Sequence, residues 1–544
     1  MEFPLERLFA KPTVAGMARV VSELQAEQED QDALEILEML AQLSDEEVDA
    51  ELGEIGVEFE EIATYSSSEL HLEDSYAIRG PMTHRARQLD YYTIIPHPTK
   101  LQILMLLNED RWSLPHLVPT RDRFFAAVND VNQAIQHQLG LTVTVLRCVE
   151  YKYNPEARTV AIYATENHDP TWTPSDGARW IEQRELNDLA LAMPEQRAVL
   201  ETWFAEAERG HIPDQRRPWA RTGWFDTTVD WINAQLDRFS LAITGPIAQV
   251  RAWGISCVLR ADTTAGPVYF RAVPAKSAHE PLLLQVLAER YPAHFPGVLA
   301  IDAARHWVLM REVKGRPLLQ VSDIKHWEEA IRGLAQIQID FAKQTDSLLS
   351  WKCPDRRLDK LAAQIDPLFA DKAALQRGQL GGLSEDEISL LRALAPELKA
   401  MCAQLASYNI PHTLEHGDFH PSNIQVTDES HVYFDWGESS VAHPFFSLGS
   451  FEYYLEYVLP DMRDMRTRLR DVYLEPWTAY EPMERLLEAF ELGRPLSALH
   501  TAFTVYRIIS SLEAAAKWEM EIESSLAFSL KMLLQLYGPQ HKRR

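Results

Sequence analysis

The chain of 544 residues is poor in cysteine, has no long apolar run and carries fewer basic than acidic residues. Its four cysteines, Cys148, Cys257, Cys353 and Cys402, are far apart and form no CxxC pair. This spacing argues against a disulfide framework and against a zinc site built on cysteines. Because no run of eighteen apolar residues occurs, no segment is expected to cross a membrane. The stretch MEFPLERLFAKP lacks the apolar core of an export signal, so we expect a cytoplasmic protein.

Basic residues are too few, and too scattered, for a nucleic-acid partner. The chain has 53 Lys and Arg against 80 Asp and Glu, a net charge of −27, and no compensating basic stripe. The acidity is uneven, since residues 1–62 hold 18 acidic and 3 basic residues. The charge therefore argues against a nucleic-acid partner, and the strong acidity of residues 1–62 sets this segment apart from the rest of the chain.

One stretch, residues 412–448, concentrates residues that bind metals and move protons. Asp418 and Asn423 are five positions apart, and Asp435 follows twelve positions later. Between them, two short alternating runs flank a polar turn, which predicts a β-hairpin with Asn423 and Asp435 side by side at its open end. Two oxygen ligands suit Mg²⁺, and the third group, Asp418, can accept the proton of an attacking hydroxyl. The pattern indicates phosphoryl transfer.

The segments HGDFHPSN (416–423) and DWGE (435–438) resemble the aminoglycoside phosphotransferase/choline kinase-like superfamily. The resemblance implies a bilobal protein-kinase-like fold, ATP and Mg²⁺ as cofactors, Asp418 as catalytic base, and Asn423 and Asp435 as metal ligands. Gly417 stands where protein kinases carry the arginine of their HRD motif. The resemblance therefore also implies a site that activation-loop phosphorylation does not switch.

The small lobe is expected at residues 215–315 and the large, mostly helical lobe at 316–544. In the superfamily a lysine on a small-lobe strand pairs with a glutamate on the next helix. Here Arg271 matches the lysine and Glu280 the glutamate, with Lys276 as an alternative cation. The hinge that would meet adenine falls at 309–313 and includes Arg311 and Val313. No GxGxxG loop is present.

Residues 86–210 are expected to form a separate domain, after a linker at 64–85. The order strand, strand, helix ending near Gly140, then strand resembles a Nudix fold. The helix that would bear the metal-binding glutamates reads Gln133 to Gln138 with no carboxylate. We therefore predict a Nudix-like α/β/α domain without hydrolytic activity.

The acidic segment 1–63 is expected to form short helices. Its first half resembles the last helices of a nonribosomal-peptide or polyketide carrier domain, but no carrier serine precedes them. A docking remnant and an acidic appendage without specific function both remain open.

The predicted fold class is multidomain α+β, with three hypotheses for function. The first is an ATP-dependent kinase that phosphorylates a hydroxyl on a small molecule. The second is a nucleotide-binding pseudokinase, motivated by Arg271. The third is an assembly protein that docks a biosynthetic enzyme or carrier module through residues 1–63. The sequence does not identify the phosphate acceptor.

Overall fold

The computed structural model describes residues 88–118, 125–152, 158–210, 212–376, 382–453, 455, 465–519 and 526–537. The predicted acidic helices of 1–63 and the linker 64–85 lie outside the described residues. None of the described helices is long and apolar enough to span a membrane.

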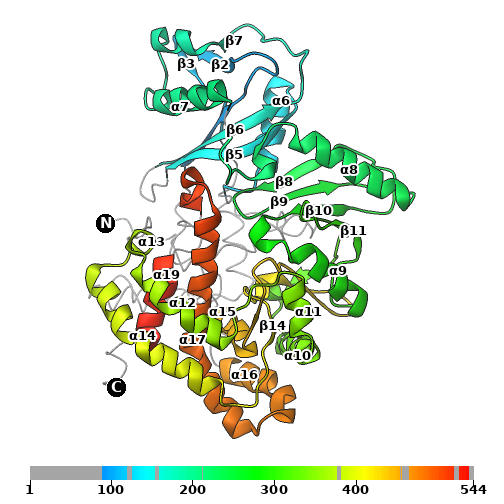
Figure 1. Ribbon diagram of the computed structural model, residues 1–544. Helices are drawn as coiled ribbons and strands as arrows, with labels where there is room; N and C mark the ends of the chain where they lie inside the picture. The colour runs from blue at the N-terminus through cyan, green and yellow to red at the C-terminus, as the bar shows by residue number, and fades with distance from the viewer. Residues whose placement is uncertain are drawn as a thin grey trace, which may run out of the picture. The chain divides into compact units, whose positions relative to one another are not determined.

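The middle region carries two small sheets (Figure 1). The first has the strand order β4-β1-β6-β5, in which β1 and β6 run parallel and the other pairs are antiparallel; the second has the order β3-β2-β7. The strands are β1 (Gln88–Ile94), β2 (Ile103–Asn108), β3 (Arg111–Ser113), β4 (His116–Leu117), β5 (Val143–Lys152), β6 (Arg158–Asn167) and β7 (Ala178–Ile181).

Two longer helices accompany these sheets. Helix α6 (Asn129–Leu139) ends at Gly140, whose φ of 66° is the left-handed conformation that glycine adopts at little cost. Helix α7 (Gln196–Arg209) buries Leu200 and Phe204 against the second sheet. The predicted strands and the helix ending at glycine are thus present. The Nudix-like interpretation of this region stays a prediction.

The small lobe is a five-stranded antiparallel sheet of order β11-β12-β10-β9-β8. Its strands are β8 (Ala248–Ala252), β9 (Cys257–Ala261), β10 (Val268–Ala272), β11 (Val298–Asp302) and β12 (Trp307–Arg311). Helix α8 (Trp224–Arg238) packs its aromatic residues on Phe270 and Trp307 of the sheet, and α9 (Glu280–Arg290) begins at the predicted glutamate (Figure 1).

Hydrogen bonds to main-chain groups join the middle region to the small lobe. The Gln249 side chain in β8 donates to the Val145 carbonyl and accepts from the Val145 amide, both at 2.8 Å. Beside it, the Ala252 amide donates to the Ala126 carbonyl, and the Val128 amide donates to the Val250 carbonyl. Residues 126–128 therefore extend the small-lobe sheet beyond β8.

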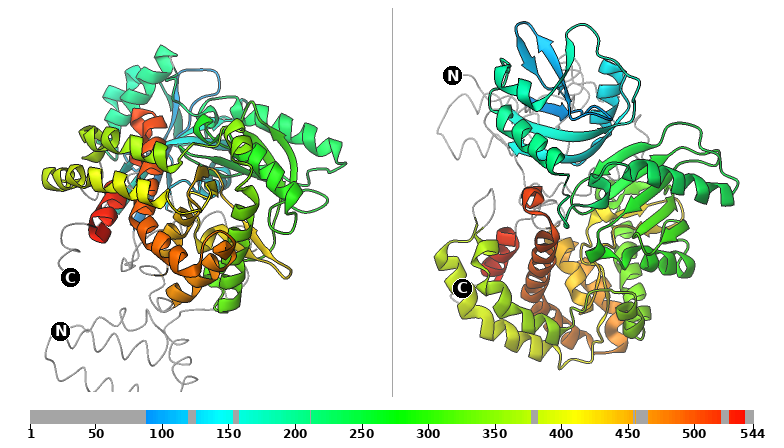
Figure 2. Two further views of the ribbon diagram at one scale, coloured as in Figure 1. Left: turned by 60° about the horizontal axis from the view of Figure 1, so that its bottom comes forward. Right: turned by 45° about the horizontal axis from the view of Figure 1, so that its top comes forward.

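The large lobe is mainly helical. Its helices are α10 (Ile324–Phe341), α11 (Thr345–Ser350), α12 (Leu358–Ala370), α13 (Lys372–Leu375), α14 (Glu385–Leu405), α15 (Ser447–Tyr453), α16 (Arg466–Leu474), α17 (Met483–Ser511) and α19 (Leu526–Tyr537). Helix α12 lies beside α14, and α17 beside α19 (Figures 1 and 2). The short strands are β13 (Arg316–Pro317), β14 (Thr413–Glu415), β15 (Ile424–Val426), β16 (His431–Tyr433) and β17 (Ser440–Ala442).

Helix α17 corrects one expectation from the sequence. Proline 495 would normally end a helix, because it lacks an N–H group and clashes with the preceding turn. We therefore expect separate helices before and after it, yet α17 continues through Pro495. Residues on both sides of the proline, including Phe490 and Leu496, are buried in the core. Packing on both sides outweighs the local cost of the proline.

Candidate active site

The predicted hairpin is present and sets the geometry of the site. Strands β15 and β16 are antiparallel, with Ile424 opposite Tyr433, and the Phe434 amide donates to the Asn423 carbonyl at 2.9 Å. Asn423 and Asp435 therefore flank the open end of the hairpin, and both line one cavity. The sequence pattern located these two side chains correctly relative to each other.

Asp418 lies on the loop before the hairpin, where neighbouring side chains orient its carboxylate. The Asn423 Nδ2 is 3.3 Å from Asp418 Oδ2 and 3.0 Å from the Asp418 carbonyl oxygen. The His420 Nε2 also lies 3.3 Å from Asp418 Oδ2. The Asp418 side chain remains 23% exposed, so a substrate hydroxyl can reach it.

Two residues at the site, Asp435 and Gly417, have a left-handed backbone conformation. Asp435 has φ of 61°, a left-handed conformation that costs a non-glycine residue on the order of 1–3 kcal/mol and is found mainly at functional sites. Gly417 has φ of 85°, and a Cβ there would overlap the Glu438 carbonyl group. Side chains with a Cβ are thus excluded at Gly417, which explains why no arginine occupies this position.

Arg271 and Glu280 form a buried ion pair that reaches Asp435. The Arg271 Nε is 3.3 Å from Glu280 Oε1, and its Nη2 donates to Asp435 Oδ1 at 2.5 Å. All three side chains are at most 10% exposed. Burial raises the pKa of Glu280 to about 8, whereas the Arg271 charge opposes that rise. Arg271 thus connects the predicted partner glutamate with the predicted metal ligand.

Lys276 lies on the other side of this charge cluster. Its Nζ is 4.0 Å from Glu438 Oε1, and its side chain is 6% exposed. Burial lowers the pKa of Lys276 to about 7 and raises that of Glu438 to about 7. Lys276 does not line the cavity that contains Arg271. Of the two candidate cations, only Arg271 faces the cleft.

The cavity between the lobes has a volume of about 80 Å³. It is lined by Arg251, Val258, Tyr269, Arg271, Glu280, Leu284, Pro296, Met310, Ser422, Asn423, Gln425, Tyr433, Phe434 and Asp435. Sequence reasoning did not find Arg251, a buried arginine of β8. The available signal was an arginine between two apolar residues, Val250 and Ala252, of a predicted strand.

The predicted hinge residues lie at the end of β12. Arg311 is exposed, and its amide donates to the Gly297 carbonyl at 2.9 Å. Val313 follows in a half-buried loop. Neither side chain lines the cavity, whereas Met310, which belongs to the same predicted hinge, does.

The turn between β8 and β9 contains one glycine, Gly254, and three distant side chains hold it. The Gly254 amide donates to Glu519 Oε2 at 2.6 Å, and its carbonyl accepts from Arg217 Nε at 2.6 Å. The Trp219 indole donates to the Trp253 carbonyl. Burial raises the pKa of Glu519 to about 8, and the Gly254 amide opposes that rise. Segments far from the turn in sequence thus fix its position.

The donor atoms at the hairpin fit a magnesium ion. The Nδ2 of Asn423 faces Asp418 and His420, which turns its Oδ1 to the opposite side. That oxygen, together with the Asp435 carboxylate, forms an all-oxygen ligand set, which Mg²⁺ prefers.

Comparison with known proteins is consistent with this site. Residues 260–500 match the family model described as "Phosphotransferase enzyme family". The match covers the C-terminal region, which has the kinase-like fold of that family, and less than half of the whole chain. No curated protein matches the chain.

Three solved structures illustrate the similarity. A choline/ethanolamine kinase family protein from Mesorhizobium loti is 13% identical, with a TM-score of 0.38 over 58% of this chain and 97% of that one. The aminoglycoside phosphotransferase APH(3'')-Id from Streptomyces rimosus is 20% identical, with a TM-score of 0.32 over 45% and 91%. Macrolide 2'-phosphotransferase MphH from Brachybacterium faecium is 15% identical, with a TM-score of 0.35 over 54% and 97%. At these scores the structures carry no argument about the activity of this chain.

Proposed function

We propose that the protein is a kinase that transfers the γ-phosphoryl group of ATP to a hydroxyl of a small molecule. The observation that carries the proposal is the convergence of Asp418, Asn423 and Asp435 at one end of a hairpin that opens into the interlobe cleft. The family match of residues 260–500 supports phosphotransfer as the reaction class.

In this proposal each residue has one task. Asp418 accepts the proton of the acceptor hydroxyl, and Asn423 and His420 hold its carboxylate in place. Asn423 and Asp435 would hold Mg²⁺, which when bound neutralises negative charge on the transferred phosphoryl group. Arg271, oriented by Glu280, lies where a cation can contact the nucleotide phosphates.

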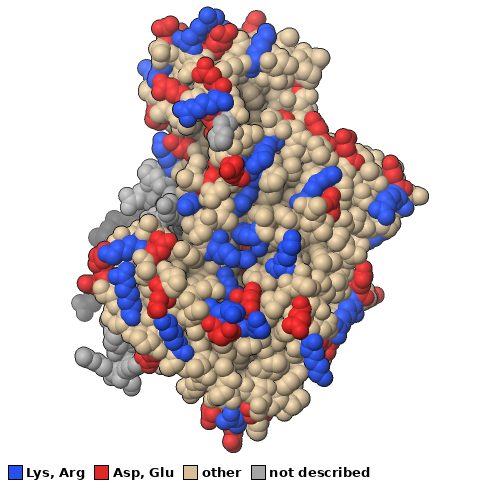
Figure 3. Space-filling model, viewed as in Figure 1, with Lys and Arg blue, Asp and Glu red and all other residues tan. Residues whose placement is uncertain are grey.

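The surface charge bears on the class of acceptor. An acidic surface would attract a polycationic aminoglycoside. On the face shown in Figure 3, acidic and basic side chains are interspersed. This face therefore gives no support to a polycation over other hydroxylated acceptors.

One observation favours a second candidate, a nucleotide-binding pseudokinase. Arg271 donates to Asp435, the residue proposed to hold the metal. For catalysis this contact must be exchanged for contacts with Mg²⁺ and phosphate. If the exchange does not occur, the cleft binds a nucleotide without turnover. A docking role for residues 1–63 toward a carrier module is a separate proposal that concerns residues outside those described.

A screen for ADP release tests the proposal. The full chain is incubated with fixed Mg·ATP and a panel of hydroxylated metabolites and antibiotics. We expect at least one acceptor to stimulate ADP release, and Asp418→Asn to reduce turnover by about 100-fold or more, with Mg·ATP affinity retained. Asp428→Asn, in the exposed turn of the same hairpin, is the matched control and should keep wild-type turnover.

Two results would contradict the assignment. Wild-type turnover by a folded Asp418→Asn variant would exclude the proposed base. Intact Mg·ATP binding with no turnover on any acceptor would select the pseudokinase.

A further inference from the structure

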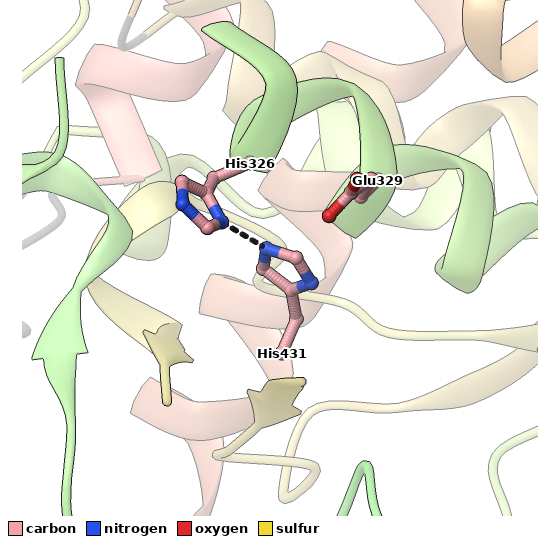
Figure 4. A group of neighbouring side chains, drawn as sticks. All are labelled: His326, Glu329 and His431. Carbon is pink, nitrogen blue, oxygen red and sulfur yellow. Dashed lines mark hydrogen bonds between the residues drawn. The ribbon is translucent and has the colours of Figure 1, made fainter. Parts of the chain in front are cut away.

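A cluster of three potential metal ligands lies outside the cleft, where α10 meets the hairpin. His326 and Glu329 come from the first turns of α10, and His431 is the first residue of β16 (Figure 4). One ligand atom from each of the three lies within 4.8 Å of the other two. Figure 4 shows the two imidazole rings meeting edge to edge, with the Glu329 carboxylate beside them.

Buried contacts fix the relative positions of these elements. Residues three apart on a helix share a face, so His326 and Glu329 point in the same direction. The fully buried Tyr433, two residues after His431, donates its hydroxyl to the Ala330 carbonyl at 2.7 Å. The cluster is therefore held by the same packing that fixes the hairpin on α10.

We propose that His326, Glu329 and His431 bind a borderline transition-metal ion, with Zn²⁺ as the expected occupant. The Nδ1 of His326 and the Nε2 of His431 are 3.2 Å apart. Two nitrogens bound to a tetrahedral zinc at about 2.0–2.1 Å lie about 3.3 Å from each other, so the imidazole pair already has the required spacing. Glu329 is exposed, and its carboxylate lies within 4.8 Å of both imidazole nitrogens.

The proton arrangement of the pair also suits a metal ion. The hydrogen between two facing neutral imidazoles belongs to one of the rings. When that ring takes the tautomer with its hydrogen on the other nitrogen, both facing nitrogens have lone pairs free for an ion. The His294 Nδ1 donates to the His431 carbonyl at 3.0 Å and steadies the strand that carries this ligand.

The ligand types separate this site from the cleft. Two histidines and one glutamate suit zinc and related ions, whereas the oxygen ligands of the hairpin suit Mg²⁺. His431 lies four residues before Asp435 in the chain. An ion at the cluster would connect α10 to the hairpin that carries Asn423 and Asp435, and so would stabilise the lobe without taking part in phosphoryl transfer.

The test uses the full chain, stripped of metal by a chelator and then titrated with Zn²⁺ in the presence of excess Mg²⁺. Calorimetry should give one Zn²⁺ per chain at this site, and Co²⁺ should give the visible absorption bands of a tetrahedral complex. We expect His326→Ala and His431→Gln each to weaken Zn²⁺ binding about 100-fold, and Glu329→Gln about 10-fold. The melting temperature should rise by a few degrees with Zn²⁺ in the wild type, and much less in His326→Ala and His431→Gln.

Two controls decide the location of the ion. His137→Ala removes an exposed histidine of α6, and Asp435→Asn removes a proposed cleft ligand; neither should change Zn²⁺ affinity. The proposal is overturned if the wild type binds no stoichiometric Zn²⁺, if folded His326→Ala binds as the wild type does, or if Asp435→Asn abolishes binding. His326 is half-buried near a helix start, so its variant is expected to fold even if His431→Gln does not.

Discussion

Replacing Arg271 with alanine is the most informative perturbation of the cleft. The arginine neutralises two buried carboxylates, those of Glu280 and Asp435, through contacts of 3.3 and 2.5 Å. Without it the two carboxylates face each other in a buried cleft, and the pKa of Glu280, already raised to about 8 by burial, loses the charge that opposes the rise. The pKa of Glu280 then rises further, so its carboxyl holds a proton more firmly and pairs less well with a cation.

The magnitude follows from the burial of the cluster. Removing one partner of a buried ion pair typically costs about 3–5 kcal/mol. We expect the free energy of unfolding of Arg271→Ala to fall by about 3 kcal/mol. If a similar energy is lost from nucleotide binding, Mg·ATP affinity or turnover falls by about 100-fold or more. Arg271→Lys keeps the charge but cannot reach both carboxylates at once, so we expect activity within about tenfold of the wild type.

The assay combines calorimetric Mg·ATP titration, ADP release and thermal unfolding. Arg305→Ala is the control, because Arg305 also pairs with an aspartate in the small lobe but is 49% exposed. Surface pairs contribute about 0–1 kcal/mol, so this variant should differ little from the wild type. The reasoning is refuted if folded Arg271→Ala retains Mg·ATP affinity and turnover within about threefold.

Two further predictions concern Gly417, beside the site, and Glu519, which holds the turn at Gly254. Gly417→Ala should lower the melting temperature strongly, because φ is 85° and the new Cβ overlaps the Glu438 carbonyl. The control Gly140→Ala, where no atom lies within 4 Å of the new Cβ, should cost only about 1 kcal/mol. Equal losses of stability in thermal unfolding would contradict the clash. The Glu519 carboxyl keeps its proton in the folded state up to about pH 8 but loses it near pH 4.5 when unfolded, so its contribution to stability is lost as pH rises through that window. Glu519→Gln should therefore flatten the decline of melting temperature with pH. The control Glu208→Gln, at an exposed position, should decline as the wild type does. Parallel pH profiles for the wild type and both variants would exclude a contribution of Glu519 to the pH dependence.

Features set by contacts between residues close in the sequence could be predicted, whereas features set by distant contacts could not. The spacing of Asp418, Asn423 and Asp435 was informative because a tight hairpin converts sequence separation into distance. The start of α9 at Glu280 was likewise a local signal. By contrast, the Gly254 amide meets Glu519 from 265 positions away, and no local pattern encodes that contact. The helix break expected at Pro495 failed because burial of both flanks, a tertiary effect, exceeds the local penalty.

The hydrogen bonds between β8 and the middle region have a consequence for the independence of the kinase part. Residues 126–128 cover the outer edge of the small-lobe sheet, and the Gln249 side chain is hydrogen-bonded to the main chain of Val145. A fragment starting at residue 215 would leave that edge uncovered, and unpaired strand edges recruit other chains into aggregates. The middle region therefore protects this edge of the small-lobe sheet from pairing with other chains.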